Sequence, residues 1–158
     1  MSFSPEYLMR LALKKAKQGV EEGQTPFGAC IVREGSILSC EHNQVWKLGD
    51  ITAHAEILAI REACRSFRSI DLSGCVIYST CEPCPMCFSA IHWAKISKIV
   101  FGARIEDAQQ IGFSELVLSN QKMKELTGSS IELLGDFLRE EVVGLFQEWS
   151  HSKKKRVY

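Results

Sequence analysis

Two short segments with metal-binding side chains constrain the fold of this chain more than any other feature. A His-Ala-Glu segment begins at His54, and a Pro-Cys-Pro-Met-Cys segment further along contains Cys84 and Cys87. A structural zinc site is normally closed by four protein ligands, whereas a hydrolytic zinc site keeps three and leaves the fourth position to water. The three side chains can act together only if the fold brings the two segments into contact. Glu56 then stands beside them as a free carboxylate.

This pattern predicts one Zn²⁺ per subunit and a hydrolytic reaction. A bound zinc lowers the pKa of its water from ~15.7 to roughly 7, so a hydroxide nucleophile is available at neutral pH. We expect His54, Cys84 and Cys87 to hold the metal. Glu56 is better suited to carry protons than to bind zinc, which makes it the candidate catalytic residue.

The composition favours a small substrate. The chain has 158 residues, 46% of them hydrophobic, so we expect one globular domain over residues 1–158. Nineteen basic and nineteen acidic side chains cancel, so no global field steers the protein onto nucleic acid. The basic run at residues 153–156 is expected to be solvated.

The cysteines and the hydropathy predict a reducing, cytoplasmic compartment. The seven cysteines are an odd number, no secretory leader is evident, and no run of eighteen apolar residues could span a membrane. Four cysteines are expected to be small buried apolar side chains without a catalytic role: Cys30, Cys40, Cys64 and Cys75.

Hydrophobic periodicity and turn residues predict alternating helices and strands. Helices are expected over residues 4–20, 53–67, 85–93 and 136–149, and strands over 27–32, 37–40, 75–78, 99–102 and 131–134. The first two strands form a hairpin around Glu34-Gly35, and residues 43–50 are expected to be a loop. The alternation indicates an α/β layered domain with parallel strands joined by helical crossovers.

Both metal segments fall at predicted helix starts. His54 is expected in the first turn of one helix, and Pro85 suits the first turn of the next. Because helix amino termini carry partial positive charge, this position should lower the pKa of Cys84 and Cys87 and favour the thiolates that zinc requires.

Two other metal sites fit the cysteines less well. Cys81, Cys84 and Cys87 open an iron–sulfur motif, but the fourth cysteine that this motif needs is absent, because Ala90 stands at its position. A closed structural zinc site with Cys81 as fourth ligand leaves Glu56 without a role. The joint pattern His-x-Glu and Pro-Cys-x-x-Cys is instead typical of zinc-dependent nucleobase deaminases.

At these residues the chain resembles the cytidine deaminase-like superfamily. The likeness is carried, in the same order and spacing, by Thr-Pro-Phe-Gly-Ala at 25–29, Asn43, Thr-Ala-His-Ala-Glu at 52–56 and Cys-Glu-Pro-Cys-Pro-Met-Cys at 81–87. The resemblance implies a three-layer α/β/α fold: a central mixed sheet of five strands, the first two antiparallel, between helices that hold zinc at two of their starts.

Within the superfamily the chain is most similar to the bacterial-type guanine deaminases. Ala-Ile-His-Trp-Ala at 90–94, Gly-Phe at 112–113 and the ending from Phe146 to Tyr158 add to the likeness. It implies hydrolysis of guanine to xanthine and ammonia, in purine catabolism or salvage. Asn43 and the backbone near Ala55 would hydrogen-bond the purine, while Phe27 and Trp93 would wall its flat faces.

The same resemblance implies a role for the end of the chain. Residues 150–158 would be a tail that closes the active site, often that of the partner subunit in a homodimer, with Tyr158 as its final contact. Family members usually have Asp two residues after the Gly-Phe pair to hold the guanine amino group. This chain has Glu115 there, and the longer carboxylate is expected to make the same contact.

Three alternatives stay open. The tRNA-editing adenosine deaminases share both metal blocks and a Phe-Gly-Ala-Arg like that at 101–104, which would make tRNA the partner and the wobble adenosine the substrate. Another aminated base or nucleoside, such as guanosine or cytosine, is a second alternative. The third is a catalytically silent subunit with this fold, against which the complete set of ligands and Glu56 argues.

Overall fold

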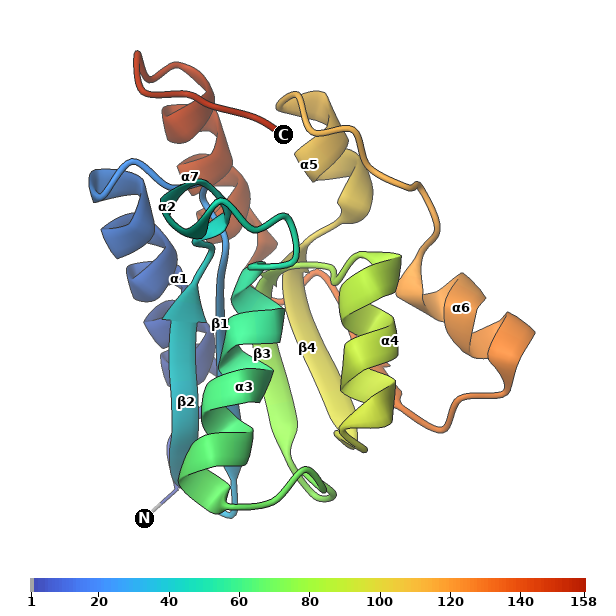
Figure 1. The fold of residues 1–158 in the computed structure, drawn as a ribbon. Coiled ribbons are helices and arrows are strands. Elements are labelled where there is room, and N and C mark those ends of the chain that lie inside the picture. The colour runs from blue at the N-terminus through green and yellow to red at the C-terminus, as the bar shows by residue number, and fades with distance from the viewer. Residues whose placement is uncertain (1) are drawn as a thin grey trace.

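A five-stranded mixed sheet forms the centre of the molecule. The computed structural model describes residues 2–158. The strands follow one another in space in the order β2-β1-β3-β4-β5 (Figure 1). Their bounds are β1 Gly28–Arg33, β2 Ser36–His42, β3 Val76–Cys81, β4 Lys98–Ala103 and β5 Glu132–Leu134. β1 pairs antiparallel with both β2 and β3, whereas β3, β4 and β5 are parallel.

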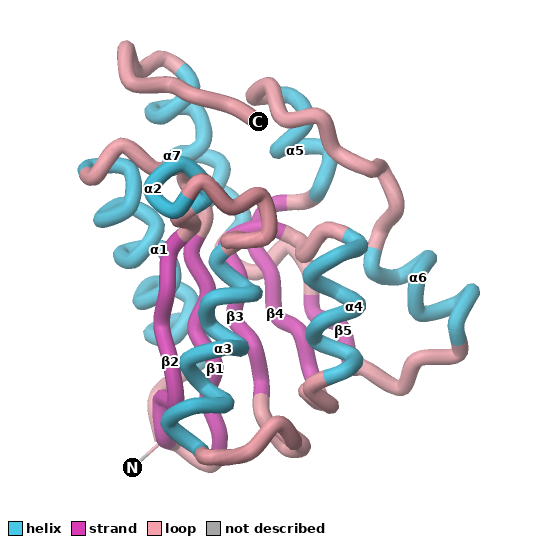
Figure 2. Tube along the Cα trace, in the orientation of Figure 1, coloured by secondary structure: helices cyan, strands magenta, loops and turns pink. Residues whose placement is uncertain are grey.

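Helices cover both faces of this sheet (Figures 1 and 2). The long helices are α1 Pro5–Glu21, α3 Ala55–Phe67, α4 Pro85–Trp93 and α7 Arg139–Ser150, and the shorter ones are α2 Val45–Leu48, α5 Ile105–Gln110 and α6 Asn120–Thr127. α3 and α4 lie on one face, with α1 and α7 on the other. The expected three-layer α/β/α fold is confirmed. Within residues 2–158, no helix is both long and apolar enough to cross a membrane.

Local sequence signals account for the first elements. The Ser4 hydroxyl caps α1 by accepting a hydrogen bond from the Tyr7 amide at 3.1 Å. Glu34 and Gly35 both have positive φ, which gives the tight two-residue turn that joins β1 to β2. Gly28 allows β1 to pack closely on α1, because a Cβ there would lie 2.2 Å from the Ala12 carbonyl oxygen.

The structure contains three short helices that were not expected, and α3 begins later than expected. The loop at residues 43–50 contains α2, and the two short helices α5 and α6 were not predicted. Helices of this length bury too few periodic residues to show a 3.6-residue pattern. His54 is the residue that precedes α3 rather than a member of its first turn.

Of the four cysteines predicted to be small buried apolar side chains, only Cys75 meets the prediction in full. Cys30 and Cys40 form a disulfide between β1 and β2, because the hairpin register sets them directly opposite each other. Cys40 and Cys64 are also only partly buried, whereas Cys75 is buried as expected.

Candidate active site

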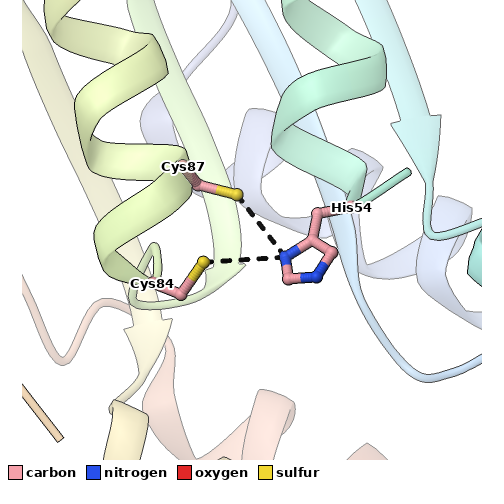
Figure 3. Close-up of side chains that lie close together, drawn as sticks. All are labelled: His54, Cys84 and Cys87. Atoms are coloured by element: carbon pink, nitrogen blue, oxygen red, sulfur yellow. Dashed lines mark hydrogen bonds between the residues drawn. The ribbon is translucent and has the colours of Figure 1, made fainter. Parts of the chain in front are cut away.

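The residues of the two metal segments meet at the amino ends of α3 and α4. His54 immediately precedes α3, Cys84 immediately precedes α4, and Cys87 lies in the first turn of α4. The two helices lie side by side on one face of the sheet. The side chains of His54, Cys84 and Cys87 point toward one another (Figure 3). The cluster therefore lies just beyond the carboxyl end of β3, where ligand sites form in sheets with parallel strands.

The three side chains fit a zinc ion. The Nδ1 atom of His54 lies 3.7 Å from the sulfur of Cys84 and 3.5 Å from that of Cys87. All three ligand atoms lie within 4.8 Å of one another. Zn–S and Zn–N bonds of ordinary length at tetrahedral angles would separate sulfur from nitrogen by about 3.6 Å. One imidazole and two thiols are also the donor set of a catalytic zinc site that keeps a fourth position open.

The cysteines share their charge unequally. Hydrogen bonds from Cys87 and His54 outweigh the effect of burial and lower the pKa of Cys84 to about 4. The pKa of Cys87 is raised well above its usual value, first by its hydrogen bond with Cys84 and then by burial. Without a cation, the cluster therefore favours one thiolate rather than the two expected, and a coordinated divalent cation would favour the second.

The pKa of the His54 imidazole depends on its neighbours Cys84 and Glu56. Burial lowers its pKa, but the hydrogen bond to Cys84 and the negative charge of Glu56 outweigh that effect and raise the pKa overall. Without a metal, the raised pKa favours the protonated ring of His54. A cation bound between Nδ1 and the two sulfur atoms would take the place of that proton and favour the neutral ring that binds metals.

Glu56 lies behind the cluster with its carboxylate held in place. It is buried in the first turn of α3, and Ser79 at the end of β3 donates a hydrogen bond to its Oε1 at 2.7 Å. The Cys87 thiol donates to Oε2 at 3.2 Å. The carboxylate is thus beside the three metal-binding atoms without being part of the set.

A small cavity of about 20 Å³ lies at the cluster, which with the tail in place is room for a water molecule rather than for a base. Its walls combine the metal-binding side chains with aromatic and polar groups: Phe27, Asn43, His54, Glu56, Cys81, Glu82, Cys84, Glu115 and Tyr158. Outside it lies a more apolar hollow between the tail and α4, to which Ile51, Met86 and Leu116 contribute.

Two predicted base contacts, Phe27 and Asn43, line this cavity, and a third, Ala55, stands in the chain between its lining residues His54 and Glu56. Asn43 is fully buried at the end of β2, and Phe27 is held edge-on by Phe113 at a ring distance of 5.0 Å. Ala55 is the first residue of α3, so its amide is one of the N–H groups that the helix leaves unpaired.

The tail brings Tyr158 to the same cavity. Asn43 donates a hydrogen bond from Nδ2 to the Tyr158 hydroxyl at 2.7 Å, and the tyrosine ring lies 5.1 Å from the Phe113 ring. Two residues earlier in the chain, the Arg156 guanidinium lies over the Trp46 ring of α2, with its Cζ 3.7 Å from the ring centroid. Burial raises the pKa of Tyr158, despite the hydrogen bond from Asn43, so its hydroxyl stays protonated.

Glu115 also faces the cavity, whereas Trp93 does not. Burial, followed by the negative charge of Cys84, raises the pKa of Glu115 to about 7. Trp93 ends α4 and is 79% exposed. Since α4 points its amino end at the cluster, its last residue is about 13 Å away along the helix axis. The expectation that Trp93 walls the base is not met within one chain.

Sequence reasoning missed several residues of this region. Glu82 is buried at the cavity, where its two carboxylate oxygens accept hydrogen bonds from the Ile105 and Asn120 amides and so anchor α5 and α6. Ser79 and Phe113 support Glu56 and Phe27. Glu82 lies between Cys81 and the predicted ligand Cys84, which indicates that it is close to the site but not that it anchors α5 and α6.

Comparison with known proteins identifies the family. The family model described as "Cytidine and deoxycytidylate deaminase zinc-binding region" matches residues 3–103, which include both metal segments. The chain belongs to this family. Members are zinc-dependent deaminases, and the three side chains that converge here stand within the matched zinc-binding region.

Relatives within the deaminase family have two different substrates in their names. A guanine deaminase from Bacillus subtilis is 36% identical over 154 residues, covering 97% of this chain and 98% of that protein. A tRNA-specific adenosine deaminase from Aquifex aeolicus is 50% identical over 98 residues, covering 62% of this chain and 65%, less than two thirds, of that protein. The solved guanine deaminase from Nitrosomonas europaea superimposes with a TM-score of 0.88 at 28% identity, covering 96% of this chain and 87% of that one.

Proposed function

We propose that this deaminase converts free guanine to xanthine and ammonia. The observation that carries the proposal is the hydrogen bond between Asn43 and the Tyr158 hydroxyl, which seats the last residue of the tail on the cavity. A tail in this position narrows the access to His54, whose ring lies 5.7 Å from the Tyr158 ring, and obstructs an anticodon loop. The match to the Bacillus guanine deaminase along almost the whole chain supports the same reading.

The cavity offers the contacts that a purine base requires. Phe27 provides an apolar ring for the flat face of the base. Asn43 uses one Nδ2 hydrogen on Tyr158, which leaves the other for the polar edge of the base. The Glu115 carboxylate would accept hydrogen bonds from the exocyclic amino group, and the Ala55 amide would donate to the opposite edge.

Zinc held by His54, Cys84 and Cys87 would supply Lewis-acid activation of water near neutral pH. Glu56 would take one proton of the attacking water and deliver it to the ring nitrogen of guanine. It would then carry the second proton, from the hydroxyl added to the ring carbon, to the departing amine, which leaves as ammonia. Because the Ser79 hydroxyl occupies Oε1, the oxygen that takes and returns the proton is Oε2. Cys87 donates to Oε2 only as a thiol, so its ionisation frees this oxygen.

Closure by the tail has a further chemical consequence. With Tyr158 in place, Asn43, Glu56 and Phe27 are all buried or nearly so. Exclusion of bulk water strengthens the hydrogen bonds to the base and fixes its orientation. We retain the prediction of a homodimer.

Editing of the wobble adenosine in tRNA is the second candidate. It is favoured by the 50% identity to the Aquifex enzyme, although that match covers only 98 residues. An ammonia-release screen over guanine, guanosine, adenine, cytosine, cytidine and a tRNA stem-loop separates the candidates. We expect release from guanine, accompanied by formation of xanthine. Release from the stem-loop with none from guanine would refute the proposal, and release from no substrate would favour a silent subunit.

A further inference from the structure

His42 is a buried histidine next to Asn43 that neither the zinc site nor the proposed chemistry uses. It ends β2 and is only 4% exposed. Its Nδ1 lies 2.8 Å from the carbonyl oxygen of Asn43, and its Nε2 lies 3.2 Å from a carboxylate oxygen of Glu22 at the end of α1. Both ring nitrogens thus face groups that accept hydrogen bonds.

The fold makes room for this ring. Gly19 belongs to α1, where glycine costs about 1 kcal/mol of helix stability relative to alanine. A Cβ at this position would lie 2.8 Å from both Cγ and Nδ1 of His42. The glycine therefore gives up helix propensity and lets the imidazole lie flat between α1 and the end of β2.

Of the two ring nitrogens of His42, Nδ1 is the one that must carry a hydrogen, because it faces the Asn43 carbonyl oxygen. The Asn43 carbonyl is buried and cannot turn to water, whereas the Glu22 side chain is 41% exposed and can be solvated. A carbonyl oxygen only accepts hydrogen bonds, so Nδ1 must carry a hydrogen for the 2.8 Å contact to be favourable.

We propose that His42 is a positioning residue for base recognition, acting through Asn43. Its Nδ1–H fixes the Asn43 carbonyl, while the Asn43 amide N–H donates to the Phe27 carbonyl at 3.0 Å. The Asn43 Oδ1 accepts from the Val45 amide at 3.0 Å. These contacts hold the peptide and the carboxamide so that Nδ2 reaches Tyr158 and the cavity. The inference rests on the proposed function in that Asn43 is taken to bind the base.

Two substitutions separate hydrogen bonding from packing. His42→Asn keeps a donor near the position of Nδ1 but loses ring volume, whereas His42→Phe keeps the ring and loses the donor. We expect His42→Phe to raise KM for guanine about tenfold with kcat changed less than twofold, because the buried carbonyl is left unpaired. His42→Asn should stay within about threefold of wild type. The reverse order would overturn the proposal and leave His42 a packing residue.

A substrate-free readout keeps this test independent of the proposed function. The side-chain amide signal of Asn43, assigned by its loss in Asn43→Asp, should persist in His42→Asn and shift or broaden in His42→Phe. In wild-type protein, long-range ¹⁵N–¹H spectra of the imidazole should show a hydrogen on Nδ1. An unprotonated Nδ1, or an Asn43 signal unchanged in His42→Phe, would refute the positioning role. Wild-type protein that does not consume guanine would refute the proposed function alone.

Discussion

The metal cluster and the proposed base-binding wall are assembled in different ways. The cluster comes from two local motifs, each at the amino end of a helix, and its three ligand atoms converge within 4.8 Å. The wall collects Phe27 before β1, Asn43 after β2, Glu115 from a loop and Tyr158 from the tail. The type of chemistry is thus encoded locally, whereas the choice of substrate depends on long-range packing. A family can therefore keep one reaction and change its substrate.

The largest effect is expected at the cluster, from Glu56→Gln. The substitution keeps the shape and the hydrogen bond with Ser79 but removes the group that accepts a proton, so turnover should fall at least a hundredfold. Zinc content, measured by atomic emission, should stay at one per chain. Glu62→Gln on the same helix is the matched control, because Glu62 pairs with Arg65 at the surface. Activity above a few per cent of wild type would mean that Glu56 is not the proton carrier.

A smaller effect is expected at the wall, from Tyr158→Phe. Only the hydroxyl is lost, so the Asn43 amide loses its acceptor and the tail its anchor at the cavity. We expect KM for guanine to rise roughly five- to tenfold, with kcat nearly unchanged, in steady-state assays. Tyr7→Phe makes the same chemical change at an exposed position on α1 and should have no effect. Equal KM values for both variants would show that the tail does not contribute to the wall.

The pH dependence of KM tests the charge on Glu115. Burial and the Cys84 charge raise its pKa to about 7, so the carboxylate becomes protonated as the pH falls through 7. The protonated form loses an acceptor for the amino group of the base, so KM should rise a few fold between pH 8 and pH 6. Glu115→Gln should abolish this part of the pH dependence, and Glu106→Gln, at an exposed position of α5, should keep it. An unchanged profile in Glu115→Gln would assign the pH dependence to another group.

The smallest effect is expected from Trp93→Ala. If the wall is complete within one chain, a side chain at the far end of α4 should change KM less than twofold. Kinetics measured across a range of protein concentrations, together with sedimentation, give the test. A large rise in KM would show instead that a partner subunit contributes Trp93 to the wall.

The sequence predicted the metal cluster better than the features that depend on long-range packing. The ligands and Glu56 were recognisable because their spacing is local, and the helix starts were recognisable from their proline and apolar periods. The antiparallel pairing of β1 with β3 and the disulfide between Cys30 and Cys40 depend on strand order and register, which no local pattern specifies. The contact of Gly19 with the His42 ring also could not be predicted, because only the packing of α1 on β2 brings these two residues together.

The most direct test of the account is a competition between its two candidate substrates. Wild-type protein loaded with zinc is given guanine and a tRNA stem-loop with a wobble adenosine at equal concentration, and xanthine and inosine are quantified by mass spectrometry. The account predicts that xanthine forms and inosine does not, because Tyr158 on Asn43 closes the cavity to a nucleotide in a loop. Inosine formed in the absence of xanthine would contradict it.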